Sequence, residues 1–480
     1  MIEQLEKLDR ESLLIFATKQ QQEIRRLQHQ LDQLLRHIYG QKSEKFTVDT
    51  NQTSLAFELP STPGKEKETI TYTREKKSQQ HNHNGRLPIP DHLPRVDEVL
   101  LPKEDITGLK KIGEEITERL ECDPGKLFVK RIIRPKYAKE DNGGVHIAPL
   151  PSSPIEKGRA GASVLALIII QKYLDHLPLY RQIEQFKRMG MEIPASTMSD
   201  WVKTGAGLIA PLYDALVKQI RKSHYLQADE TRIQVLDRDK KGKTHRGWYW
   251  TFRDPQSGLV LFDYHESRGR EGPSEVLKNF EGFLQTDGYE VYNYYDRNKI
   301  TLLHCMAHAR RYFEQAQQND KDRSQYVLKE IQKLYAVEKH CRENNLAHDD
   351  RLMLRKENSV PVLESLHAWL KEEITKVTPA SAIGKAISYA LPRWEKLMLY
   401  TTDGKLEIDN NLVENSIRPV AVGRKNYLFA GSHEAAQNAA MFYSLLGTCK
   451  LKGIEPFAWL KNIFEILPDY KANRIEELLP

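Results

Sequence analysis

Apolar residues near the start of the chain recur at the spacing of a coiled coil. Within the stretch Leu5–Tyr39, alternate steps of three and four residues separate the apolar positions Ile24, Leu27, Leu31, Leu34 and Ile38. This spacing places them along one seam of a helix, which either joins two chains or packs a single amphipathic helix on its own domain. We expect residues 1–46 to form a coiled coil through which the protein forms a homo-oligomer.

Polar residues separate this helix from the next apolar pattern. Residues 47–96 are rich in Ser, Thr, Gln, Asn, Lys and Pro, as in STPGKEKE and HNHNGRLPIP, which is typical of a polar linker. Apolar positions then alternate in LFVKRIIRPKY, as they do in strands. We expect a small β-rich module over residues 97–155.

Helical periodicity follows over residues 156–222. The pattern predicts helices at Ser163–Tyr173, Leu179–Met189 and Thr197–Lys203, with Ser196 as the N-cap of the third. The arrangement resembles a helix-turn-helix, whose second helix enters the major groove of DNA. An ordinary three-helix connector would give the same pattern.

In the helix-turn-helix interpretation, exposed side chains of this region divide by role. Basic side chains would contact phosphates, which position DNA without reading its sequence. Small polar side chains at the start of the third helix would read bases. The phosphate contacts would be Arg181, Lys187, Arg188 and Lys203, and the base-reading residues would be Ser199 and Asp200.

From Tyr225 the period becomes that of strands. YLQADETRIQVLD, RGWYWTFRD and GLVLFDYHE are separated by the turn-rich DRDKKGK and DPQSG, which predicts an antiparallel meander. A helix (PSEVLKNFEGF), a strand ending in LQTDGYE, a short helical stretch, a strand (KITLLH) and a helix over residues 307–317 follow. The order βββαβαβα is that of a ribonuclease H-like fold, a mixed sheet with helices on its faces.

The remaining segments have helical patterns. QYVLKEIQKLYAVEKH, VLESLHAWLKEEI and IGKAISYALPRWEKL predict an all-helical insertion over residues 318–404. Residues 223–317 and 405–450 would then form the catalytic domain, and residues 451–480 a C-terminal helical element. The predicted fold class is therefore multidomain α+β.

Two aspartates follow the predicted first and fourth strands. Asp229 is expected at the end of the first strand and Asp287 at the end of the fourth, and these strands are neighbours in a sheet of this kind. Taken singly, each aspartate could merely cap a turn. Together they form a pair of carboxylates that suits a hard divalent cation.

A third carboxylate, Glu414, lies in the stretch DNNLVENSIRPVAVGRKNYLFAGS. A helix over residues 410–418, N-capped by Asp409 and stopped by Pro419, would place Glu414 and Arg418 on one face. The two side chains alone could form a surface ion pair. Beside the sheet, however, Glu414 would complete the set of acids, while Arg418, Arg424 and Lys425 would contact DNA phosphates.

Composition narrows the alternatives only slightly. A formal net charge of +6 permits a polyanionic partner without requiring one. The four cysteines are far apart and indicate neither a disulfide scaffold nor a zinc ribbon. The longest apolar run, Val164–Ile170, is too short to span a membrane, and the acidic start MIEQLEKLDRE does not suit a signal peptide. We expect a cytoplasmic protein that does not bind a membrane.

Several motifs give the chain a family resemblance. It resembles the transposases of the insertion sequence 66 family, of the Asp-Asp-Glu class, along nearly its whole length and in order. The motifs are IYGQKSEKF, IRPKYA, KYLDHLPLYRQ, STMSDWV, ADET, TDGYEVYN, CMAHARRYF and the stretch DNNLVENSIRPVAVGRKNYLFAGS.

The resemblance implies a function and a site. Asp229, Asp287 and Glu414 match the family's catalytic acids, which would hold Mg²⁺ or Mn²⁺ and use it to cleave the ends of a mobile DNA element and join them to double-stranded target DNA. A Cys-x-x-His motif of the family is matched by Cys305 and His308, which we interpret as structural. The resemblance also suggests accessory proteins encoded by the element.

The sequence departs from the family pattern at the expected zinc site. Family members commonly carry cysteine pairs before the helix-turn-helix, whereas this chain has only Cys122 there and YAKEDNGG where a pair is expected. Zinc is therefore not expected.

Two alternatives to a transposase remain. The chain could be a catalytically silent DNA-binding remnant or repressor of a transposon, or a nuclease that cleaves without joining.

Overall fold

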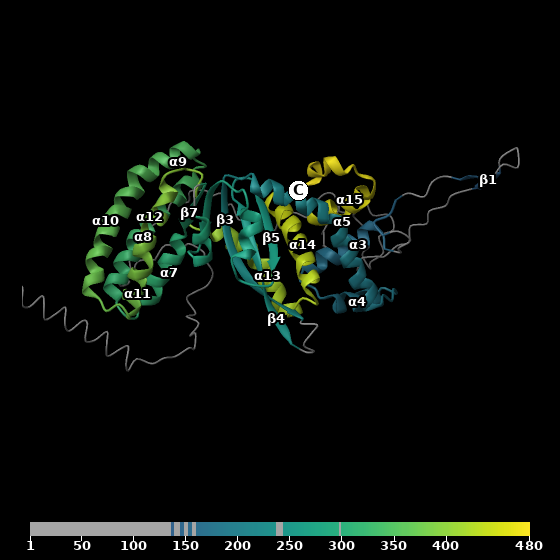
Figure 1. Cartoon of the computed structure of the whole chain (residues 1–480), viewed down its shortest axis with the longest axis horizontal. Helices are drawn as coiled ribbons and strands as arrows, with labels where there is room; N and C mark the ends of the chain where they lie inside the picture. The colour runs from purple at the N-terminus through teal and green to yellow at the C-terminus, as the bar shows by residue number, and fades with distance from the viewer. Residues whose placement is uncertain (1–135, 139–144, 148–151, 156–159, 237–242, 297–298) are drawn as a thin grey trace, which may run out of the picture. The chain divides into compact units, whose positions relative to one another are not determined.

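The computed structural model describes residues 136–138, 145–147, 152–155, 160–236, 243–296 and 299–480 (Figure 1). These residues belong to one of two compact units into which the chain divides. The predicted coiled coil, the polar linker and Cys122 lie outside the described residues. Of the predicted β-rich module, the structure describes strands β1 (Lys136–Ala138) and β2 (Val145–Ile147), which pair antiparallel.

A five-stranded mixed sheet positions the candidate site. Its strands are β3 (Tyr225–Leu236), β4 (Thr244–Asp254), β5 (Leu259–His265), β6 (Gly282–Thr286) and β7 (Ile300–His304). The order is β5-β4-β3-β6-β7, with antiparallel pairs from β3 to β5 and parallel pairs from β3 to β7. The first and fourth strands are neighbours, as predicted. The mixed α+β architecture is compatible with an Asp-Asp-Glu transposase catalytic domain.

The connections within the sheet follow the predicted order, with one boundary corrected. They are α6 (Glu271–Leu277), the 3₁₀ helix η1 (Glu290–Tyr295) and, after β7, α7 (Met306–Ala316). The helix predicted through residue 283 ends at Leu277, and Gly282 begins β6 at φ +136°. A Cβ atom at Gly282 would lie 2.1 Å from the carbonyl oxygen of His224, so only glycine fits this approach to the neighbouring strand.

Three helices precede the sheet. They are α3 (Ala162–Tyr173), α4 (Leu179–Arg188) and α5 (Ala195–Arg221). The first two match the prediction, but the third is wrong in length because α5 continues 18 residues beyond Lys203 (221−203), with Pro194 rather than Ser196 at its N-cap. Its apolar face packs on α14 and β5, and this burial outweighs the weak helix propensity of Gly205, Gly207 and Pro211.

Two helices after the insertion pack on the sheet (Figure 1). α13 (Asn411–Tyr427) contacts β3 and β4, and α14 (His433–Leu451) contacts β5 and β3. The prediction that Pro419 stops the helix of Glu414 was wrong, as was the N-cap, which is Asn410. Val413, Ile417 and Val420 are buried, so tertiary packing carries α13 through the hydrogen bond that proline removes.

All regular elements of residues 318–404 are helices. They are α8 (Lys321–Glu343), α9 (His348–Leu354), the π-helix η2 (Arg355–Ser359), α10 (Val360–Glu373), η3 (Ile374–Lys376), α11 (Ala382–Ala390), η4 (Leu391–Arg393), α12 (Trp394–Met398) and η5 (Leu399–Thr401). Their apolar residues form one core with α7, which also includes Tyr225 and Leu303 of the sheet. The insertion is thus packed directly on the strands.

The chain ends in further helices. α15 (Pro456–Ile466) packs on α3 and is followed by the short helices η6 (Leu467–Asp469) and η7 (Ala472–Leu478). A single apolar cluster includes residues of α3, α5, α14, α15 and the sheet. In the part of the chain that the structure describes, no helix is both long and apolar enough to cross a membrane.

Candidate active site

The register of two parallel strands aligns Asp229 with Asp287. Tyr225 lies opposite Phe283 and Gln227 opposite Gln285, so partners on β3 and β6 are 58 positions apart along the chain. The same separation relates Asp229 to Asp287, and both follow the last pair by two residues. Parallel strands advance at the same rate, so the two aspartates leave the paired region at one edge.

The position of Asp229 within its strand differs from the prediction. β3 does not end there but continues to Leu236, paired with β4. Pairing with β6 ends two residues before Asp229, at Gln227. Asp229 therefore lies where β3 is still paired with β4, opposite Thr251, but no longer with β6.

Asp287 occupies a fixed turn directly after β6. Its Oδ1 accepts a hydrogen bond of 2.8 Å from the Tyr289 backbone N–H, and Gly288 has φ +91°. The Tyr389 hydroxyl, from α11 of the insertion, donates to the Asp287 carbonyl oxygen at 2.7 Å. Bonds from its own turn and from the insertion therefore fix this second acid.

Glu414 lies in the first turn of α13. The Arg253 guanidinium on β4 donates to the Leu412 carbonyl oxygen at 2.8 Å and to the Ser416 hydroxyl at 3.2 Å, which fixes this turn against the sheet. The Glu414 side chain is 32% exposed. Within the described part of the chain, its Oε1 is buried and has no hydrogen-bond partner.

The three predicted acids act on one another electrostatically. Burial raises the pKa of Asp229 to about 8, and the nearby carboxylates of Glu230, Asp287 and Glu414 also raise it. Burial also raises the pKa of Glu414; Arg311 opposes this effect, while Asp409 and Asp287 add to it. The structure thus brings Asp229, Asp287 and Glu414 into one neighbourhood.

This neighbourhood is not a closed metal cage. Among the residues that the structure describes, no three His, Cys, Asp or Glu side chains lie close enough together to hold one metal ion. The raised pKa values come first from burial, and the neighbouring carboxylates add to the effect. Ligation of one cation by all three acids would require them to approach.

The Cys-x-x-His motif meets the start of α13. The Cys305 Sγ atom is buried and accepts a hydrogen bond of 3.4 Å from the Asn410 backbone N–H. The His308 side chain lies near Glu414, with its Nε2 3.7 Å from Glu414 Oε1. Burial lowers the pKa of His308 and Arg311 lowers it further, whereas Asp287 raises it. Cys305 has the contacts of a structural residue, whereas His308 touches a candidate catalytic acid.

Glu230 is a neighbouring acid that the sequence did not single out. Successive residues of a strand point to opposite faces, so Glu230 lies on the face opposite to Asp229. Its side chain is 2% exposed, binds the Arg268 guanidinium and accepts a hydrogen bond of 3.3 Å from the Tyr292 hydroxyl. Burial nevertheless raises its pKa. The only sequence pattern that pointed to it was its place beside Asp229.

The predicted phosphate contacts on α13 divide into two kinds. Arg418 and Lys425 are exposed. Arg424 instead donates to the Thr231 hydroxyl at 3.0 Å and to the Arg232 carbonyl oxygen, both on β3, and burial lowers its pKa. Two of the three basic side chains are therefore accessible to a ligand, and the third binds the sheet.

The predicted helix-turn-helix residues all lie at the surface. Arg188, Ser199 and Asp200 are exposed, on α4 and the first turns of α5. Lys187 lies 4.0 Å from Glu192, and Lys203 forms an ion pair of 2.9 Å with Glu434 of α14. These residues lie on two helices whose connection includes Gly190 at φ +83°.

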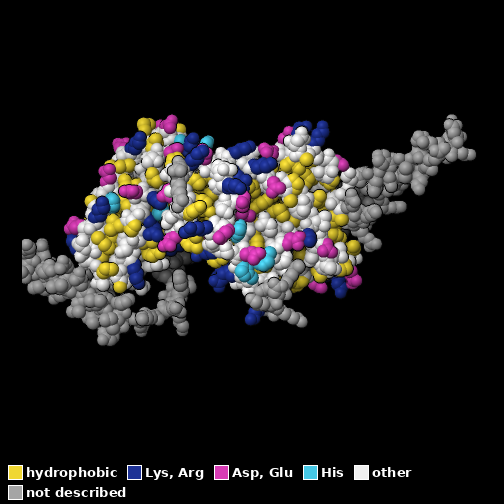
Figure 2. Space-filling model, in the orientation of Figure 1, with side chains coloured by type: hydrophobic (Ala, Val, Ile, Leu, Met, Phe, Trp, Pro, Cys, Tyr) yellow, Lys and Arg dark blue, Asp and Glu magenta, His cyan; other side chains and the backbone are white. Residues whose placement is uncertain are grey.

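The face of the molecule drawn in Figure 2 carries charges of both signs. Figure 2 shows basic and acidic side chains interspersed over the face in view, in agreement with the small net charge of +6. A nucleic-acid surface is usually recognised as a basic patch. Among the described residues, the face in view therefore shows no single basic patch that would bind DNA.

Comparison with known proteins identifies the family. The chain matches the transposase IS66 family over residues 157–438, the IS66 C-terminal element over residues 444–480 and the transposase C of IS166 homeodomain over residues 26–97. The protein belongs to the IS66 transposase family, which confirms the resemblance and supports a transposase role.

Curated relatives extend along nearly the whole chain. Uncharacterized protein y4jD of Sinorhizobium fredii is 32% identical over 93% of this chain and 92% of its own length. Uncharacterized protein y4qI of the same organism is 34% identical over 93% of this chain and 87% of its own. These relatives share the length of the chain but, being uncharacterized, do not indicate a mechanism.

Proposed function

We propose that this protein is a DNA transposase that binds the ends of a mobile element, cleaves them and joins the 3′ ends to target DNA. The observation that carries the proposal is the common neighbourhood of Asp229, Asp287 and Glu414 in a chain of the IS66 transposase family. The three acids come from a strand, the turn after a neighbouring strand and a helix packed on the sheet.

The donor set fits a hard divalent cation. Carboxylate oxygens are the ligands that Mg²⁺ and Mn²⁺ prefer. Burial and neighbouring carboxylates disfavour the ionised forms of Asp229 and Glu414, and Glu414 Oε1 has no hydrogen-bond partner among the described residues, so a bound cation would stabilise the ionised forms. Asp229, Asp287 and Glu414 would hold the cations, which supply activation of the attacking oxygen and stabilisation of the leaving oxygen.

The remaining residues of the site would position DNA. Arg418 and Lys425 are exposed on the helix that carries Glu414, where their charges suit phosphates beside the cleaved bond. Arg424 would act indirectly, because its bonds to β3 hold the last turn of α13 on the sheet. First water and then the released 3′ hydroxyl would attack a phosphodiester in line, without a covalent bond between protein and DNA.

Recognition of the element's ends would fall to α4 and α5. Lys187, Arg188 and Lys203 would contact phosphates, and Ser199 and Asp200 would read bases. We further propose that the protein forms oligomers through residues 1–46 and that the module over residues 97–155 holds no zinc. Accessory proteins encoded by the element would take part in transposition.

A joining assay tests the proposal against its two alternatives. The purified full chain is incubated with Mg²⁺, a target plasmid and DNA from the sequence that flanks its reading frame. We expect cleaved ends and covalently joined products. Cleavage without joining would identify a nuclease, and specific binding without cleavage a silent remnant or repressor.

A further inference from the structure

Two buried glutamines precede the two aspartates of the candidate site. Gln227 is two residues before Asp229 on β3, and Gln285 is two residues before Asp287 on β6. Gln227 therefore lies on the same side of β3 as Asp229, and Gln285 precedes the turn that holds Asp287. Both side chains are completely buried, and Gln227 Nε2 donates to Gln285 Oε1 at 2.9 Å. The sequence pattern alone did not point to either.

The glutamine pair also binds the segment that leads to Glu414. Gln227 Nε2 donates to the Asp409 carbonyl oxygen at 2.9 Å, and Gln227 Oε1 accepts from the Val413 backbone N–H at 3.2 Å. Gln285 Nε2 donates to the Glu407 carbonyl oxygen at 2.8 Å. The strands that carry the two aspartates are thus bonded to the chain on either side of the N-cap of α13.

The Tyr225 hydroxyl joins this cluster from the same face of β3. It donates to Gln285 Oε1 and accepts from the Glu407 backbone N–H at 3.1 Å. Gln227, Gln285 and Tyr225 therefore offer only neutral groups to the backbone. Neutral amides with both a donor and an acceptor can bind carbonyl and N–H groups without adding charge beside three carboxylates.

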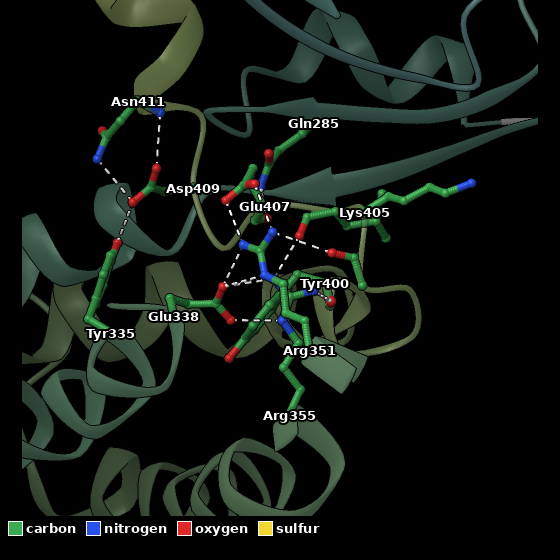
Figure 3. A network of polar contacts seen from close by, with 12 residues as sticks. Gln285, Tyr335, Glu338, Arg351, Arg355, Tyr400, Lys405, Glu407, Asp409 and Asn411 are labelled. Atoms are coloured by element: carbon green, nitrogen blue, oxygen red, sulfur yellow. Dashed lines mark hydrogen bonds and ion pairs between the residues drawn. The ribbon is translucent and has the colours of Figure 1, made fainter. Parts of the chain in front are cut away.

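The insertion holds the same segment from the opposite side (Figure 3). The Tyr335 hydroxyl donates to Asp409 Oδ2 at 2.8 Å, and the Arg351 guanidinium binds Glu407 Oε2 at 2.8 Å. Arg355 donates to the Leu406 carbonyl oxygen at 2.8 Å. Residues 406–409 are thus held between α8, α9, η2 and the strands, and α13 begins directly after this segment.

We propose that Gln227 and Gln285 are positioning residues that set the place of Glu414 relative to Asp229 and Asp287. Glu414 belongs to a different part of the chain from the two strands, so contacts in the folded protein must set its place. Hydrogen bonds in a buried region hold such a place because water does not replace them when they break. The catalytic meaning of this arrangement rests on the proposed function, whereas the positioning itself does not.

Hydrogen exchange of the full chain tests the positioning directly. In Gln227→Met, which keeps the side-chain length but removes the amide, the Val413 N–H loses its bond to Gln227 Oε1 and keeps only its 3.1 Å bond to the Asn410 carbonyl oxygen. We expect its exchange to accelerate several-fold. Thr448→Val is the matched control, because Thr448 is equally buried and its hydroxyl accepts from Val260 N–H on β5 at 3.2 Å. It should accelerate exchange at Val260 and leave Val413 unchanged.

The affinity for Mn²⁺ distinguishes a positioning role from a merely structural one, because only a positioning role would change it. Electron paramagnetic resonance of free Mn²⁺ should show several-fold weaker binding in Gln227→Met and Gln285→Met, and parent-like binding in Thr448→Val. Tyr225→Phe removes one hydroxyl and keeps the ring, so it serves if a glutamine variant does not fold.

The outcomes separate this proposal from the proposed function. Unchanged Val413 exchange in Gln227→Met, or equal acceleration in Thr448→Val, would overturn the positioning role. Unchanged Mn²⁺ affinity in the glutamine variants would do the same. If the parent itself binds no Mn²⁺, the metal-dependent function fails, and Val413 exchange alone decides the positioning.

Discussion

His308 Nε2 lies 3.7 Å from Glu414 Oε1, so the helix after the last strand meets the helix that carries the third candidate acid. The contact joins α7 to the first turn of α13 across more than a hundred residues of chain, most of them in the insertion. It shows that the insertion returns the chain to the sheet edge where Asp229 and Asp287 lie. The candidate site is therefore built by tertiary structure.

Protonation of His304 should lower the free energy of unfolding at acidic pH. Burial lowers its pKa from 6.5 to about 4; Lys396 and Arg393 also lower it, and Asp296 opposes them. The unfolded state thus takes up a proton at a higher pH than the folded state, so this contribution to stability is present above about pH 6.5 and is lost as the pH falls towards 4. Between these values, the parent should lose on the order of 3 kcal/mol more than His304→Gln. Chemical denaturation at several pH values measures the difference, and parallel curves would show that His304 does not titrate in this way.

Breaking a buried ion pair of the insertion should cost more stability than breaking a pair at its surface. Arg355 and Glu338 are completely buried and paired at 2.7 Å, and Arg355 also donates to three backbone carbonyl oxygens. Arg355→Met leaves Glu338 and these carbonyls short of donors, so the free energy of unfolding should fall by about 3–5 kcal/mol. Lys333→Met, which breaks an exposed pair with Glu330, should cost less than about 1 kcal/mol. Similar losses in the two variants, measured by denaturation, would contradict this account.

Basic residues of α13 should divide into two classes. Arg418→Ala and Lys425→Ala should weaken binding to all duplexes and each reduce the slope of log affinity against log salt by about one, because both side chains are exposed. Arg424→Ala should instead lower the melting temperature, since its guanidinium binds Thr231 and Arg232. Fluorescence anisotropy at several salt concentrations, together with thermal unfolding, measures both effects. An unchanged salt slope in Arg418→Ala and Lys425→Ala would remove α13 from the DNA interface.

Residues of α4 and α5 should differ in how they affect DNA sequence preference. Lys187→Ala with Arg188→Ala should weaken binding to terminal and random DNA alike, since phosphate contacts carry no sequence information. Ser199→Ala and Asp200→Ala should change the ratio between the two affinities. Competition binding with terminal and random duplexes measures that ratio. If the parent itself binds both equally, these helices do not read sequence.

Much of the fold could be predicted from local pattern. The alternation of apolar residues gave the strands, and the order of elements placed the strand of Asp229 beside that of Asp287. The boundaries that failed depend on distant residues. α5 continues past Lys203 because it packs on α14, and α13 passes Pro419 because it packs on β3 and β4. Local propensity does not contain such contacts.

The acidic residues of the candidate site could be predicted from the sequence, but the residues that contact and position them could not. Carboxylates at strand ends and in a basic stretch of sequence are visible as types of residue. By contrast, the docking of Arg424 on β3 and the contact of His308 with Glu414 depend on geometry. So do the bonds of Gln227 and Gln285, since neutral buried amides have no pattern that distinguishes them from other glutamines.

Other acids near Glu414 are already engaged. Glu407 binds the Arg351 guanidinium, and Asp409 accepts from the Tyr335 hydroxyl and from the Asn411 backbone N–H. Their bonds hold the segment before α13, whereas Glu414 Oε1 has no hydrogen-bond partner in the part of the chain that the structure describes. Glu414 is therefore the best candidate for the third acid, and Glu407 and Asp409 are the nearest substitutes should it fail.

The most direct measurement is Mg²⁺-dependent cleavage and joining of terminal DNA by variants of the three acids. Asp229→Asn, Asp287→Asn and Glu414→Gln keep size and shape but remove the ionised oxygen that a hard cation prefers. Each should fold and bind terminal DNA yet lose about a thousandfold or more in rate, and a double variant should be no worse because the ligands act as one unit. A Glu414→Gln protein that cleaves and joins near the parental rate, while Asp229→Asn is inactive, would contradict the assignment of Glu414.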